Sequence, residues 1–241
     1  MRTLCRGTSR DIKGQIVQRP PSLAEKTRHA QELLRGVLEQ HSADRIAVAF
    51  TGGKDSTLAL FFWRHALLEA SSAALPLALN LDTGLKFPEV LDFRDQLVRN
   101  WGVRLHVARP QRTSVPVALD KTACCKERKI EPLLAAIEEL GVTLLITGIR
   151  ADEHPSRAVL PFLEHCAGHD RLHPLLAFSE MDVWAAIHEH GLPWSTLYEQ
   201  GYRSLGCIPC TELPRKGGNE RSGRAGQKEA VMDDLRALGY F

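Results

Sequence analysis

Residues 47–57, AVAFTGGKDST, decide the fold: a short apolar run breaks at two glycines, and a KDS triplet and a helical pattern follow. Gly52 and Gly53 can take positive φ values and bring backbone N–H groups close to an oxyanion, which a Cβ would obstruct. A helix that begins near Ser56 would direct its free N–H groups and positive dipole end to the same point, with Lys54 as a mobile cation. Ser56 could cap this helix or contact a phosphate oxygen. The stretch therefore predicts an anion-binding turn.

An ordinary strand-to-helix turn with a capping serine is the simpler interpretation, but an intact GGKDS between a strand and a helix disfavours it. The Walker A spacing GxxxxGK[ST] is absent, so ordinary P-loop NTPase chemistry is not implied. The loop resembles the SGGKDS pyrophosphate loop of the PP-loop superfamily, with Thr51 in place of the usual first serine. This resemblance implies an adenine nucleotide alpha hydrolase-like fold, whose members typically split ATP between the α- and β-phosphates.

The composition fits a soluble enzyme. The 241 residues suffice for one large domain with a small appendage, and 44% hydrophobic with 25% charged residues is ordinary for a globular chain. The net charge of +2 indicates no particular partner. No run approaches the length of a membrane span, and the polar start lacks the apolar core of a signal peptide. We therefore expect a cytoplasmic protein without a membrane partner.

Apolar strands alternate with amphipathic helices along the chain. We expect helices over 22–41, 56–69, 88–101, 125–140 and 179–189, and strands over 45–50, 75–81, 104–108 and 142–149. Strands spaced by helices imply parallel βαβ units. The sequence thus predicts an α/β fold with a doubly wound, mostly parallel sheet, helices on both faces, and ligands at the carboxyl ends of the strands.

Two further motifs follow predicted strands. In LDTGLKFPE, Asp82 could accept from a ribose hydroxyl or hold a metal, and Gly84 allows a tight turn, although a purely structural turn fits equally well. In GIRADEHPSR, Arg150 and Arg157 offer planar donors for phosphate or sulfate oxygens. Surface arginines paired with the acidic residues of that motif are the alternative. Three strand ends with phosphate-binding residue types together favour a nucleotide pocket.

Four cysteines are grouped as an adjacent pair and a CxxC motif: Cys124, Cys125, Cys207 and Cys210. Such thiols could hold zinc, an iron–sulfur cluster or a redox disulfide. An adjacent pair fits a small tetrahedral ion poorly, whereas neighbouring cysteines can each reach a different iron of a cubane. We therefore favour a four-iron cluster over zinc and over free or disulfide-linked thiols. Cys5 and Cys166 look unpaired, and Cys166 lies in what resembles a polar loop.

From Arg45 to Arg224 the glycine loop, LDTGLKFPE, CCKERKIEPL, GIRADEHPSR, HPLLAFSEMDVWAAIHEHGLPWSTLYEQGYRSLGCIPCT and ERSGR follow one another. This order resembles the adenylylsulfate and phosphoadenylylsulfate reductase family, and CC with CxxC resembles its cluster-bearing branch. The resemblance implies that the four grouped cysteines ligate a 4Fe-4S cluster, with Lys129 near it to tune its charge. It also implies that Arg150 and Arg157 bind the phosphosulfate or its equivalent. The residues expected to bind nucleotide are Thr51, Gly52, Gly53, Ser56, Asp82, Gly84 and Arg157, and the expected catalytic residues are Lys54, Asp55 and Arg150.

Two departures from that family direct the functional prediction. Its reductases carry a nucleophilic cysteine in a C-terminal ECGLH segment, and here no cysteine follows Cys210. A carboxylate cannot replace a thiolate as the nucleophile at that sulfur. The reductases have also mostly lost GGKDS, in which Lys54 would neutralise charge on departing pyrophosphate and Asp55 could hold Mg²⁺. Both departures favour ATP cleavage over reduction of a ready-made sulfonucleotide.

We therefore predict a PP-loop ATP pyrophosphatase with an iron–sulfur cluster, which adenylylates an acceptor and then takes part in sulfur transfer. The acceptor could be nucleic acid, because residues 211–228 are polar and basic, or a small molecule. A sulfur or electron donor protein and a homo-oligomer are also compatible with the sequence. The alternatives are an adenylylsulfate reductase that uses Cys5, Cys166 or a partner's thiol, and a non-catalytic nucleotide-binding sensor subunit.

The expected organisation has three parts. They are an N-terminal helical segment (1–44), a PP-loop nucleotide-binding domain with the iron–sulfur site (45–210), and a basic C-terminal tail (211–241). The tail is rich in glycine and charge, so we expect it to be loose and solvated.

Overall fold

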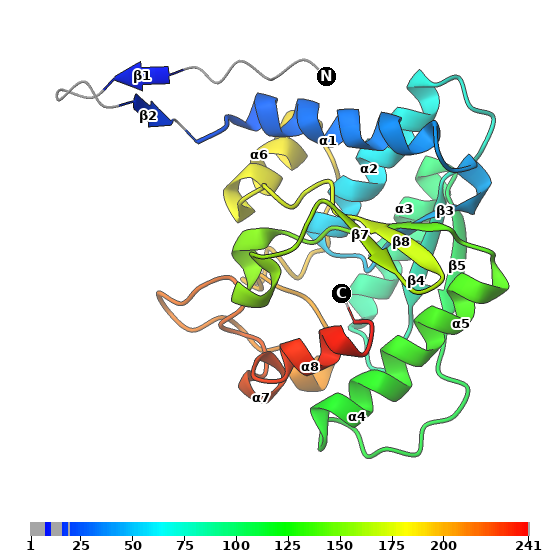
Figure 1. The fold of residues 1–241 in the computed structure, drawn as a ribbon. Helices are drawn as coiled ribbons and strands as arrows, with labels where there is room; N and C mark the ends of the chain where they lie inside the picture. The colour runs from blue at the N-terminus through cyan, green and yellow to red at the C-terminus, as the bar shows by residue number, and fades with distance from the viewer. Residues whose placement is uncertain (1–7, 11–15, 19, 241) are drawn as a thin grey trace.

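The computed structural model describes residues 8–10, 16–18 and 20–240, and Cys5 lies outside these ranges. Two short strands, β1 (Thr8–Arg10) and β2 (Ile16–Gln18), pair antiparallel. The rest of the described chain builds a mostly parallel six-stranded sheet covered by helices, which confirms the predicted fold class (Figure 1).

The central sheet has the strand order β5-β4-β3-β6-β8-β7. Neighbouring strands are parallel except β7 and β8, which form an antiparallel hairpin at one edge. The strands are β3 (Ile46–Ala49), β4 (Leu77–Leu81), β5 (Arg104–Ala108), β6 (Leu144–Ile146), β7 (Leu163–Cys166) and β8 (His169–Leu172). The strand order reverses between β3 and β6, and sheets of this kind bind ligands at the carboxyl ends of the strands at such a point.

Helices cover both faces of the sheet because side chains of a strand alternate between the two faces. Ile46 and Val48 belong to the core formed with α1, α2 and α6, whereas Ala47 and Ala49 pack with α5. The helices are α1 (Leu23–Leu38), α2 (Lys54–Glu69), α3 (Pro88–Trp101), α4 (Lys121–Cys125), α5 (Glu131–Glu139), α6 (Glu180–Glu189), α7 (Gly226–Glu229) and α8 (Met232–Ala237). None of the helices in the described chain is long and apolar enough to cross a membrane.

Helix starts agree well with their sequence signals. Ser22 opens α1 through a reciprocal capping box with Glu25, and Ser179 opens α6 in the same way with Asp182. Pro88 occupies the first turn of α3, where its missing N–H costs nothing.

Three elements differ from the prediction. The helix expected from 125 to 140 begins at Lys121 and contains a π-helical segment, Lys126–Ile130, between α4 and α5. Of the strand expected over 142–149, only Leu144–Ile146 forms a strand, β6. Strands β7 and β8 were not expected, since charged and histidine side chains hide the apolar alternation of this edge hairpin, and Cys166 therefore lies in a strand.

The expectation of a loose, solvated C-terminal tail is wrong for residues 211–240. Met232 and Leu235 of α8 are buried and pack against Cys125 and Ile130. The basic residues expected to be solvated are Arg215, Lys216, Arg221, Arg224 and Lys228. Three of these five are buried: Arg221, Arg224 and Lys228. Composition misled the prediction because these cations are buried in ion pairs and beside other polar groups of the site.

Candidate functional site

The glycine loop joins β3 to α2, and glycine is favoured at its two glycine positions for different reasons. Gly52 has φ +80°, and a Cβ there would lie 2.8 Å from Cγ1 of Val90. Gly53 has φ −89° and is the N-cap of α2, so a positive φ is not its role. Crowding favours glycine at this position, because a Cβ would lie 3.3 Å from the Tyr198 hydroxyl.

Ser56 does not cap α2, because the helix begins two residues before the predicted start. Its hydroxyl donates to the Gly53 carbonyl (2.9 Å) and accepts from the Thr51 N–H (3.2 Å). These bonds fasten the loop to the first turn of the helix, and anion binding by this turn stays a prediction.

Lys54 is a fixed, buried cation rather than a mobile one, with 1% of its surface exposed. Its Nζ donates to Asp55 Oδ2 (3.0 Å), to the Arg203 carbonyl (3.4 Å) and to Glu220. Burial alone would lower the pKa of Lys54, but the negative charges of Asp55 and Glu220 raise it well above its ordinary range. The ammonium group therefore stays protonated.

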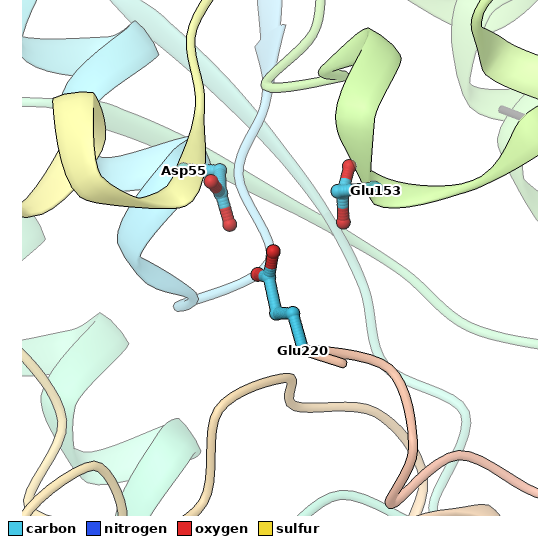
Figure 2. Close-up of side chains that lie close together, drawn as sticks. All are labelled: Asp55, Glu153 and Glu220. Carbon is cyan, nitrogen blue, oxygen red and sulfur yellow. The ribbon is translucent and has the colours of Figure 1, made fainter. Parts of the chain in front are cut away.

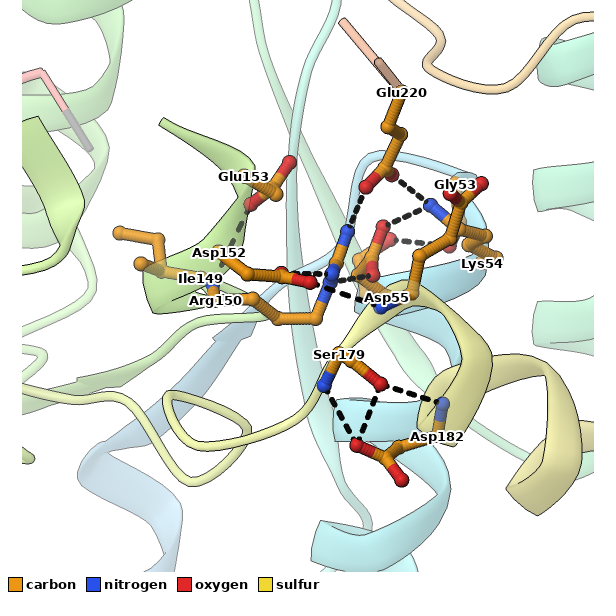
Figure 3. Close-up of polar contacts among 12 residues, drawn as sticks. Gly53, Lys54, Asp55, Ile149, Arg150, Asp152, Glu153, Ser179, Asp182 and Glu220 are labelled. Atoms are coloured by element: carbon orange, nitrogen blue, oxygen red, sulfur yellow. Dashed lines mark hydrogen bonds and ion pairs between the residues drawn. The ribbon is translucent and has the colours of Figure 1, made fainter. Parts of the chain in front are cut away.

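Arg150 is fully buried in the same network. Its Nε donates to Asp55 Oδ1 at 2.6 Å, and the guanidinium also pairs with Asp152 and Glu220. Figure 3 shows the Glu220 carboxylate between Lys54 and Arg150, so one carboxylate holds both cations. The donors that the sequence assigned to phosphate are thus bound by carboxylates here.

Glu153 extends the network toward two further arginines. It pairs with Arg157 and lies 3.5 Å from Arg221. Burial would raise the pKa of Glu153, but the positive charges of Arg157, Arg150 and Arg221 lower it to about 2. The pKa of Glu220 is raised instead, because its burial outweighs the neighbouring cations.

Three carboxylates from distant parts of the sequence converge here. One oxygen each of Asp55, Glu153 and Glu220 lies within 4.8 Å of the others. Figure 2 shows them approaching from α2, from the turn after β6 and from the C-terminal segment. Carboxylate oxygens are the ligands that Mg²⁺ takes in nucleotide-binding sites, so this set could hold a divalent cation.

A cavity of about 130 Å³ lies against the glycine loop. It is lined by the predicted residues Thr51, Gly53, Asp55, Ser56 and Arg157 and by the unpredicted Glu153, Tyr198, Arg221, Arg224 and Tyr240, among others. Nε of Arg224 is buried and has no hydrogen-bond partner in the described chain, as expected of a donor that awaits an anion. The ERSGR motif was the available signal for the two arginines. A larger groove of about 750 Å³, between β5 and α5, contains none of the predicted site residues.

Asp82 and Gly84 do not reach this cavity. Asp82 accepts from the Gly84 N–H (3.0 Å) and pairs with Arg109 (3.1 Å), and Gly84 has φ +71°, as a tight turn requires. Their position at the end of β4 shapes the loop that leads to α3, and a nucleotide role for them stays a prediction.

The four grouped cysteines line one small cavity of about 20 Å³. Cys124 and Cys125 end α4, directly before the π-helical segment, while Cys207 and Cys210 lie on the loop that pairs with residues 85–86. All four are free thiols. The fold therefore brings together two motifs that the sequence separates by about 80 residues, as a common ligand site for the four thiols would require.

Cations surround these thiols, and no carboxylate lines the described cavity. Lys129 and Lys228 are buried, and both lie over the Tyr240 ring, 5.4 and 4.8 Å from its centroid. Burial would raise the pKa of the Cys207 thiol, but Lys129 and neighbouring cations lower it to about 7, and the Thr83 hydroxyl lies 3.2 Å from its Sγ. A thiolate-ligated anionic cluster fits this excess of positive charge better than a neutral disulfide would.

Residues 45–213 match the model of the phosphoadenosine phosphosulfate reductase domain. The chain belongs to the phosphoadenosine phosphosulfate reductase family. One curated relative is the adenosine 5'-phosphosulfate reductase of Allochromatium vinosum. It is 32% identical to this chain, and the alignment covers 86% of this chain and 85% of that protein.

Several solved structures share the fold of this chain, although their sequence identity to it is low. A phosphoadenylyl-sulfate reductase from Candida auris has a TM-score of 0.62 and 20% identity, over 83% of this chain and 100% of that one. The Candida glabrata FMN adenylyltransferase with FMN and the ATP analogue AMPCPP has a TM-score of 0.66 and 19% identity, over 84% and 71%. The U34-tRNA thiolase NcsA from Methanococcus maripaludis, with its 4Fe-4S cluster, has a TM-score of 0.56 and 15% identity, over 95% and 83%.

Cys166 is the remaining thiol of this family member within the described chain. It lies in β7 at the sheet edge and lines neither the cavity beside the glycine loop nor the one lined by the four cysteines, and burial raises its thiol pKa. A raised pKa leaves less nucleophilic thiolate. Its position and chemistry therefore argue against a role as the reductase nucleophile.

Proposed function

We propose that this chain splits ATP between the α- and β-phosphates and adenylylates an acceptor as the first step of a sulfur transfer. An acceptor oxygen attacks the α-phosphorus and forms the new P–O bond. The bond from the α-phosphorus to the oxygen bridging it to the β-phosphate breaks, and pyrophosphate leaves with that electron pair. Catalysis would come from positioning and from stabilisation of the charge on the leaving group.

The observation that carries this proposal is the convergence of Lys54, Arg150 and three carboxylates on the glycine loop. The two buried cations match the charge that develops on departing pyrophosphate. Asp55, Glu153 and Glu220 would hold a Mg²⁺ ion, which would offset the negative charge of the phosphates. Three carboxylates would repel the phosphosulfate of a ready-made sulfonucleotide, whereas a metal-bound triphosphate tolerates them.

On ATP binding, the phosphates would replace Glu220 as the partner of Lys54 and Arg150. The freed carboxylate would then be available to the metal beside Asp55 and Glu153. This exchange keeps every buried charge paired throughout, which a buried cation such as Arg150 requires. Lys54 would stabilise the leaving group, while Arg157 and Arg221 would orient the remaining phosphate oxygens.

The residues Cys124, Cys125, Cys207 and Cys210 would hold a 4Fe-4S cluster, which would supply a site for binding or delivering sulfur. A thiolase with this fold carries such a cluster, and this supports a sulfur-transfer role. Lys129 and Lys228 would balance the cluster's negative charge. The acceptor would be a nucleic acid or a small molecule, and a partner protein would supply sulfur or electrons.

Sulfonucleotide reduction is the second candidate, because the aligned relatives are named adenosine 5'-phosphosulfate reductases. It would require a thiol from a partner or from outside the described residues. The two candidates differ in their substrate and in their product, so a single set of assays separates them.

The first test measures pyrophosphate release from ATP and Mg²⁺ by the anaerobically purified protein, with total RNA or a small-molecule extract as acceptor. We expect release that falls about 100-fold or more in Lys54→Met. Arg28→Met, which removes an exposed cation of α1 away from the cavity, should behave as the unmodified protein. Sulfite release from adenylylsulfate with thioredoxin, without ATP turnover, would overturn the proposal in favour of the reductase.

A further inference from the structure

Tyr198 lies on the loop after α6 and reaches the start of α2. Its hydroxyl oxygen accepts a hydrogen bond from the Lys54 backbone N–H at 2.8 Å. The residue lines the nucleotide cavity beside Thr51, Gly53 and Asp55. A tyrosine from a distant loop thus occupies a position at a helix N-terminus that a serine or aspartate usually fills.

Aromatic contacts hold the phenol ring in place. The Trp184 ring stands nearly perpendicular to it, at 88° and 5.1 Å between centroids, and Trp184 also packs edge-on against Trp194 at 6.0 Å. Nζ of Lys54 lies 5.9 Å from the centroid of the Tyr198 ring. A side chain with two rotatable bonds that is packed in this way is well suited to present one polar atom at a fixed point.

The hydroxyl hydrogen of Tyr198 is available to a ligand. The oxygen uses its acceptor capacity on the Lys54 N–H, and no oxygen of the described residues accepts the hydrogen. Burial raises the pKa of Tyr198, so the phenol keeps this hydrogen at neutral pH. Gly53 leaves the hydroxyl uncovered, because any larger residue would crowd it.

We propose that Tyr198 donates a hydrogen bond to an oxygen of the pyrophosphate group, both in bound ATP and as that group leaves; this inference rests on the proposed function. The bond would strengthen as negative charge develops on the leaving group, because charge-assisted hydrogen bonds are stronger than neutral ones. Tyr198 would then contribute more to the rate of cleavage than to the binding of ATP.

The test is Tyr198→Phe in the iron-loaded protein, with inorganic pyrophosphate and Mg²⁺ as the probe in titration calorimetry. We expect pyrophosphate to bind roughly 10-fold more weakly, as for loss of a hydrogen bond to a charged group. AMP should bind unchanged, since it lacks the leaving group. The kcat for pyrophosphate release should fall by more than the KM for ATP rises.

Tyr202→Phe is the matched control, because Tyr202 belongs to the same loop, packs on Phe87 at 5.5 Å and does not line the cavity. Equal weakening of AMP and pyrophosphate in Tyr198→Phe would mean that the tyrosine only supports the helix start, and would overturn the inference. Unchanged pyrophosphate affinity would overturn it as well while leaving ATP cleavage standing. If the unmodified protein binds adenylylsulfate but neither ATP nor pyrophosphate, the proposed function fails, and this inference fails with it.

Discussion

The nucleotide cavity and the cysteine cavity lie in the same part of the fold but balance their charges in opposite ways. Beside the nucleotide cavity three buried cations meet carboxylates: Lys54 and Arg150 share Glu220, and Arg157 pairs with Glu153. Arg224, which also lines this cavity, is the exception, because its guanidinium donates to the Thr211 hydroxyl instead. In the cysteine cavity the buried lysines have thiols and a phenol as neighbours instead.

The difference shows in the pKa values of two buried lysines. Carboxylates raise the pKa of Lys54, whereas burial and the nearby Lys129 lower that of Lys228 to about 8. At the cysteine cavity Tyr240 and the thiols raise the pKa of Lys129, so part of the positive charge is balanced from within. Lys228 keeps its buried charge at a cost, and a site with such an excess is suited to an anion that arrives separately. The nucleotide cavity, by contrast, can stay folded and closed by its own residues until a substrate exchanges with Glu220.

The largest expected effect concerns the cysteine cavity. Cys124→Ser should abolish retention of iron and labile sulfide, because serine is a poor ligand for iron in a cluster built on thiolates. Anaerobic iron and sulfide analysis measures this. Cys166→Ser, in the edge strand β7, should retain the full content. One zinc and no sulfide in the unmodified protein would contradict the cluster.

The next largest effect concerns the nucleotide cavity, where carboxylates pair with the buried cations. Glu220→Gln should lower the free energy of unfolding by about 3 kcal/mol, because it leaves Lys54 and Arg150 without their shared carboxylate. Urea unfolding of the nucleotide-free protein measures the change. Glu212→Gln, at an exposed position of the same segment, should stay within about 0.5 kcal/mol of the unmodified protein. A change equally small for Glu220→Gln would show that this carboxylate does not close the cavity.

The sequence predicted the elements that its local signals control. Pro88 and the capping pair of Ser179 and Asp182 mark helix starts that occur as expected, and buried β3 follows from its apolar run. The ion pair of Lys54 with Glu220 could not be predicted, because the two residues are 166 positions apart in the sequence. Long-range pairing of this kind depends on tertiary packing and leaves no periodic trace in the sequence.

The convergence of the four cysteines on one cavity was predictable for the opposite reason. Their chemistry is carried by residue type and close spacing, so the fold only has to bring two short motifs together. The cations around them were not predictable, since Lys228 belongs to a stretch whose composition resembles a solvated tail. Burial of such a lysine needs a neighbour that no composition reveals, and here Tyr240 provides a hydrogen-bond partner at 3.1 Å.

Lys228→Met tests the difference in charge balance between the two cavities, and its expected effect on stability is the smallest. Removing a buried cation that no carboxylate pairs should stabilise the iron-free protein by about 1 kcal/mol, because methionine fills similar space without the cost of desolvation. The same change should speed iron release to a chelator in the loaded protein, since the cluster loses a balancing charge. Lys216→Met, at an exposed position, should alter neither quantity. If Lys228→Met instead destabilises the iron-free protein as strongly as Glu220→Gln, both cavities are balanced from within and the excess charge around the cysteines does not anticipate a cluster.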